Sequence, residues 1–361
     1  MPLTPAPLAF QPLRIADVRR ETDDVVSLAF DVPDSLRARF AYAPGQYLTL
    51  RATVGGEQVR RSYSICSGLD DGEIRVAVKH VPDGLFSAHA NTVFQVGDIV
   101  DVMPPAGRFG LGTASAPVIL ALAAGSGITP ILSILKTALA RDPRARCILL
   151  YGSRGTASIL FRSALEDLKD RFLGRLTVIH ILSREAQDVA VLNGRLDAAK
   201  LRALLPSLAD PGEIGQALIC GPAEMIDDLT ETLADLGVPP ARIHSERFTP
   251  SADASRPRRV TPVPTTAAPF AMAAIVHEGK TTEVPVAAGE AVLDAALRAG
   301  LDLPWSCRAG MCSTCRARVS DGGVEMAQNF SLEPWETDAG YVLTCQAIPT
   351  TARLTVDYDQ V

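Results

Sequence analysis

Apolar and polar residues alternate with a period of two along the first third of the chain, in short segments that Gly, Pro and Asp interrupt. Residues 24–30, 46–50 and 73–78 are examples of such segments. Alternate side chains of a strand point to opposite faces, so this pattern predicts half-buried strands. We therefore expect an antiparallel β-barrel, or a sandwich, within residues 1–112.

After residue 117 the pattern changes to buried strands, turns and amphipathic helices in alternation. An apolar run at 118–122 leads through a glycine-containing turn into a helical segment at 131–139. Further segments of both kinds follow, strands at 147–151, 176–182 and 217–222, and helices at 159–172 and from 224. We predict a parallel α/β sheet with right-handed crossovers over residues 113–250.

The remaining sequence divides into a linker and a third domain. Residues 251–269 are rich in Pro, Thr and Ala and show no periodicity, which is typical of a semi-extended linker. Residues 270–361 contain two short strand patterns, a helical segment near 291–299 and a cysteine-rich loop. A multidomain protein of three parts is therefore expected.

Length and charge agree with this organisation. The chain has 361 residues, which is enough for two or three domains that each bury a core. The formal net charge is −6, and residues 270–361 alone account for it with twelve acidic and six basic side chains. An acidic module is suited to electrostatic docking on a partner, and a solvated acidic face is the plainer interpretation. Nothing in the sequence indicates nucleic-acid binding.

We expect neither a signal peptide nor a membrane span. The first residues lack the basic start and apolar core of a signal peptide, and the best apolar run, 117–124, suits a buried strand. Three cysteines outside the cysteine-rich loop, Cys66, Cys147 and Cys220, have no disulfide-like arrangement. A reducing cytoplasm is the compartment that fits them.

Four cysteines form the strongest chemical motif of the chain. Cys307, Cys312 and Cys315 follow the spacing C-x4-C-x2-C, and Cys345 lies thirty positions after the last of them. This is the plant-type spacing of a [2Fe–2S] cluster, in which four thiolates bind two irons. Gly310 lets the loop curl so that backbone N–H groups face the sulfurs. A zinc site and buried free thiols are the alternatives, but zinc sites more often pair C-x2-C with a second close pair.

Two stretches of the first domain are suited to a ring compound that carries phosphate. Residues 61–64 form an R-x-Y-S string, and strand alternation puts Arg61 and Tyr63 on one face and the two serines on the other. A guanidinium binds phosphate and a phenol ring stacks on a flat ring, although a polar barrel strand explains the string equally well. Residues 84–87 precede a short helical stretch, whose N–H groups and serine hydroxyl could cap the helix and bind a pyrophosphate.

A glycine turn joins the first strand and helix of the α/β region. It contains Gly125 and Gly127, and the helix that follows directs its N-terminus toward the turn. Such a turn lets a nucleotide phosphate approach the backbone closely. G-x-G by itself is a weak signal, because it is often only a tight turn.

Together these strings resemble those of the ferredoxin–NADP reductase superfamily, fused to a C-terminal plant-type ferredoxin. The resemblance covers nearly the whole chain and is carried by R-S-Y-S at 61–64, G-S-G-I-T-P at 125–130, C-G-P at 220–222 and the cysteine loop. Within the superfamily, the stretch from 324–330 to 341–346 is similar to the reductase subunits of phenylacetyl-CoA epoxidases. These epoxidases are multicomponent di-iron monooxygenases of phenylacetate breakdown. The implied architecture is an FAD-binding barrel, an NAD(P)-binding α/β domain and a β-grasp ferredoxin domain.

The resemblance also implies roles for individual residues. Arg61 would hold the FAD pyrophosphate, Tyr63 would stack on the isoalloxazine, and Ser64 would hydrogen-bond near N5. Cys220 would lie against the nicotinamide, and Glu246 belongs to a segment that the family places over the flavin. The implied catalytic residues are Ser64, Cys220 and Glu246. The implied cofactor-binding residues are Arg61, Ser62, Tyr63, Ser64, Lys79, Val81, Gly84, Leu85, Phe86, Ser87 and Phe248 for FAD, and Gly125, Ser126, Gly127, Thr129, Ser153, Arg154, Cys220 and Gly221 for the pyridine nucleotide.

The turn after the second α/β strand bears on the choice between NADPH and NADH. It contains Ser153 and Arg154 but neither Asp nor Glu. A carboxylate would accept the ribose 2′-hydroxyl, whereas serine and arginine offer donors and positive charge to a 2′-phosphate. NADPH is therefore favoured, and the alternative is that Arg154 is a solvated turn residue.

These cofactors predict an electron-transfer reductase. Nicotinamide gives up two electrons as hydride, a [2Fe–2S] cluster accepts one, and a flavin converts between them. The expected route runs from NADPH through FAD and the cluster, at about −400 mV, to the oxygenase component of a multicomponent monooxygenase. One alternative is the reductase of another ring-hydroxylating or di-iron oxygenase. Another is a redox sensor or electron carrier without catalytic turnover.

Overall fold

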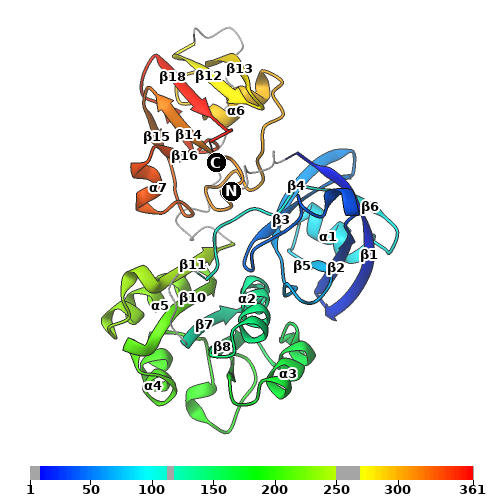
Figure 1. Cartoon of the computed structure of the whole chain (residues 1–361), viewed down its shortest axis with the longest axis vertical. Coiled ribbons are helices and arrows are strands. Elements are labelled where there is room, and N and C mark those ends of the chain that lie inside the picture. The colour runs from blue at the N-terminus through cyan, green and yellow to red at the C-terminus, as the bar shows by residue number, and fades with distance from the viewer. Residues whose placement is uncertain (1–8, 112–117, 249–268, 361) are drawn as a thin grey trace. The chain divides into compact units, whose positions relative to one another are not determined.

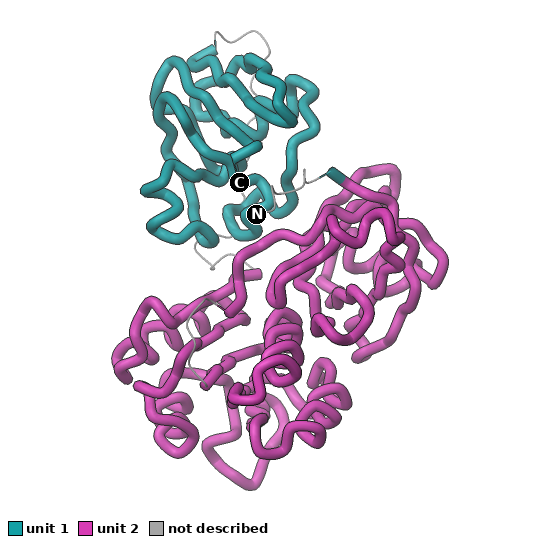
Figure 2. The backbone as a smooth tube through the Cα atoms, in the orientation of Figure 1, with its two compact units in different colours: residues 1–9, 250–361 teal, residues 10–249 magenta. Residues whose placement is uncertain are grey.

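The structure, a computed structural model, describes residues 9–111, 118–248 and 269–360. It divides into two compact units, one of residues 10–249 and one that contains the chain from residue 250 onward (Figure 2). The expected linker lies outside the described residues except for its last position, as does the expected boundary at 112–113. Within the described ranges, no helix is long and apolar enough to cross a membrane.

The first part of the larger unit is a six-stranded antiparallel sheet that closes on itself. Its strands follow the order β4-β3-β6-β1-β2-β5, and a bridge between Ile65 and Val76 joins the two ends of the sheet. Alternate apolar residues such as Leu28 and Leu48 fill the interior without exposure. The elements are β1 (Gln11–Thr22), β2 (Val25–Asp31), β3 (Tyr47–Val54), β4 (Glu57–Ser64), β5 (Ile74–Lys79), α1 (Leu85–Thr92) and β6 (Ile99–Val102). The predicted antiparallel barrel is confirmed.

The second part of this unit is a five-stranded parallel sheet with helices on both faces (Figure 1). The strand order is β11-β10-β7-β8-β9. In β7, Leu120 and Leu122 pack with α4 and α5, whereas Ala121 and Ala123 pack with α2 and α3. The elements are β7 (Val118–Ala124), α2 (Ile128–Arg141), β8 (Arg146–Ser153), α3 (Arg162–Arg171), β9 (Leu176–Leu182), α4 (Ala198–Leu208), β10 (Ile214–Gly221), α5 (Ala223–Asp235) and β11 (Ile243–Arg247). The predicted parallel α/β sheet is confirmed.

Helix α2 connects the barrel and the parallel sheet through a shared core and through polar contacts with the loop at 67–71. Ser133 Oγ donates to the Ser67 carbonyl at 2.6 Å, and Thr137 Oγ1 accepts from the Leu69 N–H at 3.1 Å. Lys136 forms an ion pair of 2.7 Å with an aspartate of the same loop. The barrel and the α/β part are therefore one folded body.

The smaller unit has a five-stranded mixed sheet that packs on one helix. Its strand order is β13-β12-β18-β14-β16, with β12 and β18 parallel, and β15 and β17 form a separate pair. Helix α6 buries Val292, Leu293 and Ala296 against this sheet, which is the predicted β-grasp arrangement. The elements are β12 (Ala271–His277), β13 (Lys280–Val286), α6 (Val292–Arg298), β14 (Arg316–Asp321), β15 (Val324–Met326), α7 (Pro334–Asp338), β16 (Tyr341–Leu343), β17 (Ala347–Pro349) and β18 (Arg353–Asp357).

Three helix boundaries differ from the sequence prediction. The helix expected over 159–172 begins only at Arg162, because Phe161 adopts a left-handed conformation with φ 58°. The residues expected to precede a helix at 84–87 already form its first turn. Helix α2 begins three residues earlier than expected, directly after the glycine turn. In addition, α4 and α7 were not predicted, since α4 contains Pro206 and α7 has only five residues.

Candidate functional site

The cysteine loop curls as its sequence predicts. Gly310 has φ +75°, and a Cβ at this position would lie 3.0 Å from the carbonyl oxygen of Gln328. The loop directs N–H groups at sulfur: Ala309 N lies 3.4 Å from Cys307 Sγ, and Cys307 N lies 3.5 Å from Cys312 Sγ. These donors stabilise negative charge on the thiolates, as a metal cluster requires.

The four predicted ligands lie together as two pairs. Cys307 neighbours Cys312, whose hydrogen bond lowers the pKa of the Cys307 thiol to about 6. Cys315 neighbours Cys345 and lowers the pKa of that thiol by the same kind of contact. Among the described residues, no three His, Cys, Asp or Glu side chains converge to hold a single ion. Two neighbouring thiol pairs suit a two-iron cluster, which is bound by four cysteines.

Hydrogen bonds tie together the segments that carry Cys315 and Cys345. The Thr344 N–H and hydroxyl both donate to the Cys315 carbonyl, at 3.2 and 2.9 Å. Tyr358 donates its phenolic hydrogen to Thr344 Oγ1 at 2.7 Å, and burial raises the pKa of this tyrosine. Cys345 follows the end of β16 closely, so this strand positions the fourth thiol.

A buried ion pair lies directly after Cys315, the third predicted ligand, and the sequence analysis missed it. Arg316 Nε lies 2.8 Å from Glu336 Oε1 of α7, with side-chain exposures of 7% and 2%. The guanidinium also lies 3.5 Å from the ring centroid of Tyr341, which begins β16. Arg316 thus connects the start of β14, helix α7 and the strand that leads to Cys345. The only sign of this pair in the sequence is that Arg316 directly follows the last cysteine of the loop.

The R-x-Y-S string occupies β4 and its residues differ in exposure. Arg61 is exposed and donates to the Arg60 carbonyl at 2.7 Å. Tyr63 is partly buried, its ring centroid lies 5.6 Å from that of Phe86, and burial raises its pKa. Ser62 Oγ lies 3.0 Å from Thr49 Oγ1 on the neighbouring strand. The exposed arginine and the half-covered phenol ring are suited to a phosphate and to a flat ring, respectively.

Helix α1 begins at the segment predicted to bind a pyrophosphate. Gly84 is its N-cap residue, and no side chain caps the first N–H groups. The expectation that Ser87 caps the helix is wrong, because its hydroxyl donates to the Gly84 carbonyl at 3.0 Å and accepts the Val81 N–H at 3.1 Å. Phe86 is a barrel core residue with 1% exposure, whereas Leu85 is half exposed. The free helix N-terminus is chemically suited to phosphate.

Two further residues of the predicted FAD set flank this helix start. Lys79 ends β5 and forms an ion pair of 3.5 Å with Asp24. Val81 has 55% of its surface exposed. The Gly84 N–H donates to the Val81 carbonyl at 3.0 Å, so Val81 lies next to the start of the helix.

The three predicted catalytic residues meet at the boundary between the barrel and the parallel sheet. Ser64 Oγ donates to Glu246 Oε2 at 3.0 Å, and Glu246 pairs with Cys220 in the register of β10 and β11. Loss of surrounding water raises the pKa of Glu246 to about 8, and the Ser64 hydroxyl opposes this rise. Burial, and then the Glu246 charge, raise the pKa of Cys220. Cys220 has no exposed surface, and Phe248 packs on the core cluster to which it belongs.

The glycine turn brings the start of α2 against β10. A Cβ on Gly127 would lie 2.1 Å from the Cys220 carbonyl oxygen, so only glycine fits. Gly125 has φ +54° and accepts a hydrogen bond from Tyr151 at 3.0 Å. Thr129 is buried and donates its hydroxyl hydrogen to the Ser126 carbonyl at 2.9 Å. No side chain caps α2, and the N–H of its first residue, Ile128, donates to the carbonyls of Gly125 and Ser126.

At the end of β8, the two predicted coenzyme-selecting residues differ in exposure. Ser153 has 8% exposure, whereas Arg154 is exposed. A second exposed arginine, Arg184, follows β9, and its N–H donates to the Arg154 carbonyl at 2.7 Å. Glu185 accepts from the Thr156 N–H and hydroxyl, both at 2.6 Å. The sequence analysis missed Arg184, because only the pairing of β8 and β9 brings it next to Arg154.

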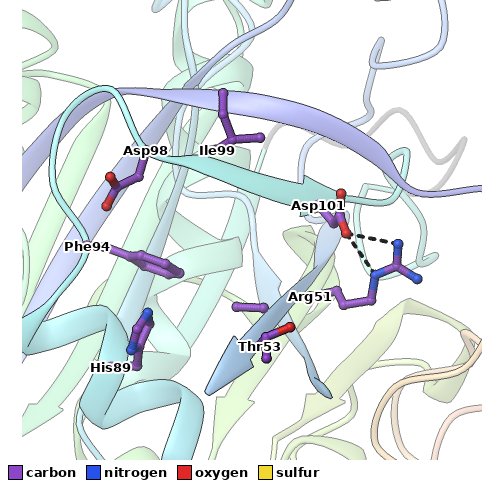
Figure 3. Close-up of a pocket in the computed structure, with 8 residues that line it drawn as sticks. Arg51, Thr53, His89, Phe94, Asp98, Ile99 and Asp101 are labelled. Atoms are coloured by element: carbon purple, nitrogen blue, oxygen red, sulfur yellow. Dashed lines mark hydrogen bonds and ion pairs between the residues drawn. The ribbon is translucent and has the colours of Figure 1, made fainter. Parts of the chain in front are cut away.

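A cavity of about 390 Å³ lies on the barrel where β3 and β6 separate (Figure 3). Arg51 donates to Asp101 Oδ2 at 2.9 and 3.0 Å on one side of it. His89 and Phe94 lie on another side, with ring centroids 4.8 Å apart. None of its eight lining residues belongs to the predicted cofactor-binding set.

Three family descriptions match the chain in consecutive stretches. An oxidoreductase FAD-binding domain matches residues 12–110, an oxidoreductase NAD-binding domain matches 121–231, and a 2Fe-2S iron-sulfur cluster binding domain matches 275–350.

Whole-chain relatives have the same organisation. A component of the 1,2-phenylacetyl-CoA epoxidase of Escherichia coli (strain K12) is 43% identical over 97% of this chain and 98% of its own length. The ferredoxin reductase component of 3-ketosteroid-9-alpha-monooxygenase from Rhodococcus rhodochrous is 35% identical over 96% of both chains. The solved structure of phthalate dioxygenase reductase is similar in fold, with a TM-score of 0.58 and 21% identity over 96% of this chain and 98% of that one.

Proposed function

Because the chain belongs to the family of FAD- and NAD-binding oxidoreductases that carry a C-terminal [2Fe–2S] domain, we propose that it is the reductase component of a multicomponent monooxygenase, with phenylacetyl-CoA 1,2-epoxidase as the acceptor. The observation that carries the proposal is the identity of 43% over 97% of the chain to a component of such an epoxidase. It spans the flavin, nucleotide and cluster modules together.

The chain binds FAD, a pyridine nucleotide and a [2Fe–2S] cluster through its three modules. When bound, FAD would accept the two electrons of one hydride and release them one at a time. We assign the flavin pyrophosphate to Arg61 and the start of α1, and the isoalloxazine to Tyr63. The exposed guanidinium and the uncapped helix N-terminus support the first assignment.

Ser64 and Glu246 are proposed to hold and exchange a proton beside the flavin. With a pKa of about 8, Glu246 holds a proton at neutral pH, and its Oε2 accepts from the Ser64 hydroxyl. This pair can exchange a proton at Ser64 Oγ when the charge of its surroundings changes. Cys220 is proposed to lie against the nicotinamide, which requires the residues that cover it to move, because the thiol has no exposed surface.

NADPH is the proposed electron donor. Arg154 and Arg184 offer two positive charges next to each other at the carboxyl ends of β8 and β9. Parallel sheets bind nucleotides at these ends. Glu185 directly follows Arg184 in the sequence, but its carboxylate accepts hydrogen bonds from the Thr156 N–H and hydroxyl. A 2′-phosphate therefore meets donors and positive charge.

The acidic C-terminal module is proposed to dock on the oxygenase. Its excess of six negative charges supports electrostatic attraction to a basic partner surface. The three cysteines outside the cluster motif, Cys66, Cys147 and Cys220, are buried. A reducing cytoplasm is the proposed compartment.

Reconstitution tests the proposal. The purified protein, with the oxygenase component of a phenylacetyl-CoA epoxidase, is expected to support NADPH-dependent epoxidation of phenylacetyl-CoA. Cys345→Ala is expected to abolish delivery to the oxygenase while the flavin still reduces ferricyanide, and Cys147→Ala, a buried thiol of the α/β core, is the matched control. Equal loss of both activities in Cys345→Ala would contradict the route through the cluster.

A steroid or other ring-oxygenating partner is the second candidate acceptor. The whole-length similarity to a 3-ketosteroid monooxygenase reductase component supports it. Parallel reconstitution with that oxygenase separates the two candidates, because electron delivery depends on a matched docking surface. A protein that binds its cofactors but reduces neither oxygenase nor cytochrome c would instead be a sensor or carrier.

A further inference from the structure

Gln346, which follows the fourth cysteine ligand, connects the two segments that carry the cluster thiols. Its side-chain Nε2 lies 3.0 Å from the Arg308 carbonyl oxygen and 3.7 Å from Cys345 Sγ. Its Cγ would lie 3.3 Å from a Cβ on Gly310, so the side chain packs directly beside the glycine of the loop. Only 8% of Gln346 is exposed. The side chain is therefore held in one place between the loop and the ligand.

The orientation of the amide follows from its partners. The Arg308 carbonyl can only accept a hydrogen bond, so the amide nitrogen must face it. That nitrogen has two hydrogens, and the second is available to Cys345 Sγ. The Gly310 N–H also reaches this thiol, so a backbone donor and a side-chain donor converge on one sulfur.

Hydrogen bonds to a ligand sulfur change the electron affinity of an iron–sulfur cluster. One-electron reduction breaks no covalent bond and adds one unit of negative charge, which the ligand sulfurs share. A donor at the sulfur stabilises the reduced state more than the oxidised state, and this raises the reduction potential. The effect is stronger where water is excluded, as around Gln346.

We propose that the Gln346 side-chain amide is a hydrogen-bond donor to Cys345 Sγ that raises the reduction potential of the [2Fe–2S] cluster. The inference rests on the cluster but not on the identity of the oxygenase. Its second contact, with the Arg308 carbonyl, positions the donor. A glutamine after the last ligand thus adjusts how readily the chain accepts an electron from its flavin and passes it on.

The test is an EPR-monitored redox titration of the full-length protein and of Gln346→Met. Methionine has nearly the same length and fills the space beside Gly310, but it has no donor. The equilibrium constant for cluster reduction is expected to fall by about tenfold, which is about 59 mV for a one-electron couple. The cluster signal per chain is expected to stay at the wild-type level. Gln360→Met, at an exposed glutamine of the same unit, is the matched control and is expected to leave the potential unchanged.

Each outcome decides the proposal. A fall of about threefold or more in the equilibrium constant, with the cluster retained, supports it. A smaller change overturns it, even if iron is lost faster to a chelator, because Gln346 would then only hold the loop. If Gln346→Met assembles no cluster, Gln346→Leu is titrated in its place, and failure of both to assemble also overturns the proposal. The EPR signal of the wild-type protein tests whether the cluster is present. A missing cluster can therefore be distinguished from a cluster whose potential does not depend on Gln346.

Discussion

Ser64 Oγ and Glu246 Oε2 lie 3.0 Å apart although 182 positions separate the two residues in the sequence. Ser64 ends a strand of the barrel, and Glu246 lies on the edge strand of the parallel sheet. The contact places a carboxyl with a raised pKa at the boundary between the barrel and the parallel sheet. Its protonation state affects the stability of the larger unit.

Glu246 is expected to make the larger unit less stable as pH rises. Its pKa is about 8 in the folded chain and 4.5 in the reference state, so between these values the folded protein binds the proton that the unfolded chain has lost. The free energy of unfolding therefore falls with rising pH in this window, by at most about 1.4 kcal/mol per pH unit. Glu246→Gln is expected to flatten this dependence in urea unfolding between pH 5 and pH 8.

Glu231→Gln is the control for this measurement, since Glu231 is an exposed glutamate of α5 in the same unit. It is expected to retain the wild-type slope. An unchanged slope in Glu246→Gln would show that the carboxyl titrates normally.

Arg154 and Arg184 are expected to select NADPH together. Removing either guanidinium takes a charged donor from the 2′-phosphate, so KM for NADPH is expected to rise by about tenfold or more in Arg154→Ala and in Arg184→Ala. KM for NADH is expected to change little. Steady-state ferricyanide reduction with each coenzyme gives the ratio of KM for NADPH to KM for NADH. Arg144→Ala, at an exposed arginine of the same domain, is the control, and an equal change for both coenzymes would refute the assignment.

The buried pair of Arg316 and Glu336 is expected to be strongly coupled. Arg316→Met leaves the Glu336 carboxylate buried without its cation, which costs about 3–5 kcal/mol in the free energy of unfolding. The double variant Arg316→Met/Glu336→Leu is expected to recover much of this loss, because two apolar side chains replace both charges. Chemical unfolding of the single and double variants gives the coupling energy.

Arg14 and Asp31 provide a surface pair for comparison, at 2.6 Å with side-chain exposures of 53% and 51%. Arg14→Met is expected to change stability by less than about 1 kcal/mol. A small effect of Arg316→Met, similar to that of Arg14→Met, would mean that water reaches the buried pair.

Trp335 is expected to anchor the oxygenase. Its side chain is 59% exposed on α7, between the exposed carboxylates of Glu333 and Asp338. Hot spots of protein interfaces are enriched in tryptophan, so Trp335→Ala is expected to weaken binding by about 2 kcal/mol. Electron transfer to the oxygenase, measured at subsaturating partner, would fall about thirtyfold, while ferricyanide reduction stays unchanged. Phe270→Ala removes another exposed aromatic ring of this unit and serves as the control.

The features that sequence could predict are those whose residues are close together in the chain or repeat with a fixed period. The cysteine loop is one, since three cysteines lie within nine residues, and the parallel sheet is another, since its strands are continuous apolar runs. The start of α3 could not be predicted, because the left-handed Phe161 has an apolar side chain that fits a helical pattern. Ser87 was misassigned because its hydroxyl turns back to Gly84 inside the helix.

The residues that sequence reasoning missed act across the fold. Arg184 reaches Arg154 only through the pairing of two parallel strands, and Glu336 reaches Arg316 only when α7 packs on β14 and β16. The contact between the Gln346 amide and the Arg308 carbonyl likewise exists only in the folded chain. The sequence alone does not show which distant residues become neighbours, because that depends on how the strands and helices pack.

The contacts of α2 with the loop at 67–71 have a consequence for how such proteins diversify. A recombination event that replaced the barrel alone would bring in a foreign loop and leave Ser133, Thr137 and Lys136 without their matched acceptors and donors. One that exchanged the C-terminal module would leave these contacts intact. The barrel and the nucleotide domain are therefore expected to be inherited as a single piece, since each of them carries one half of these contacts.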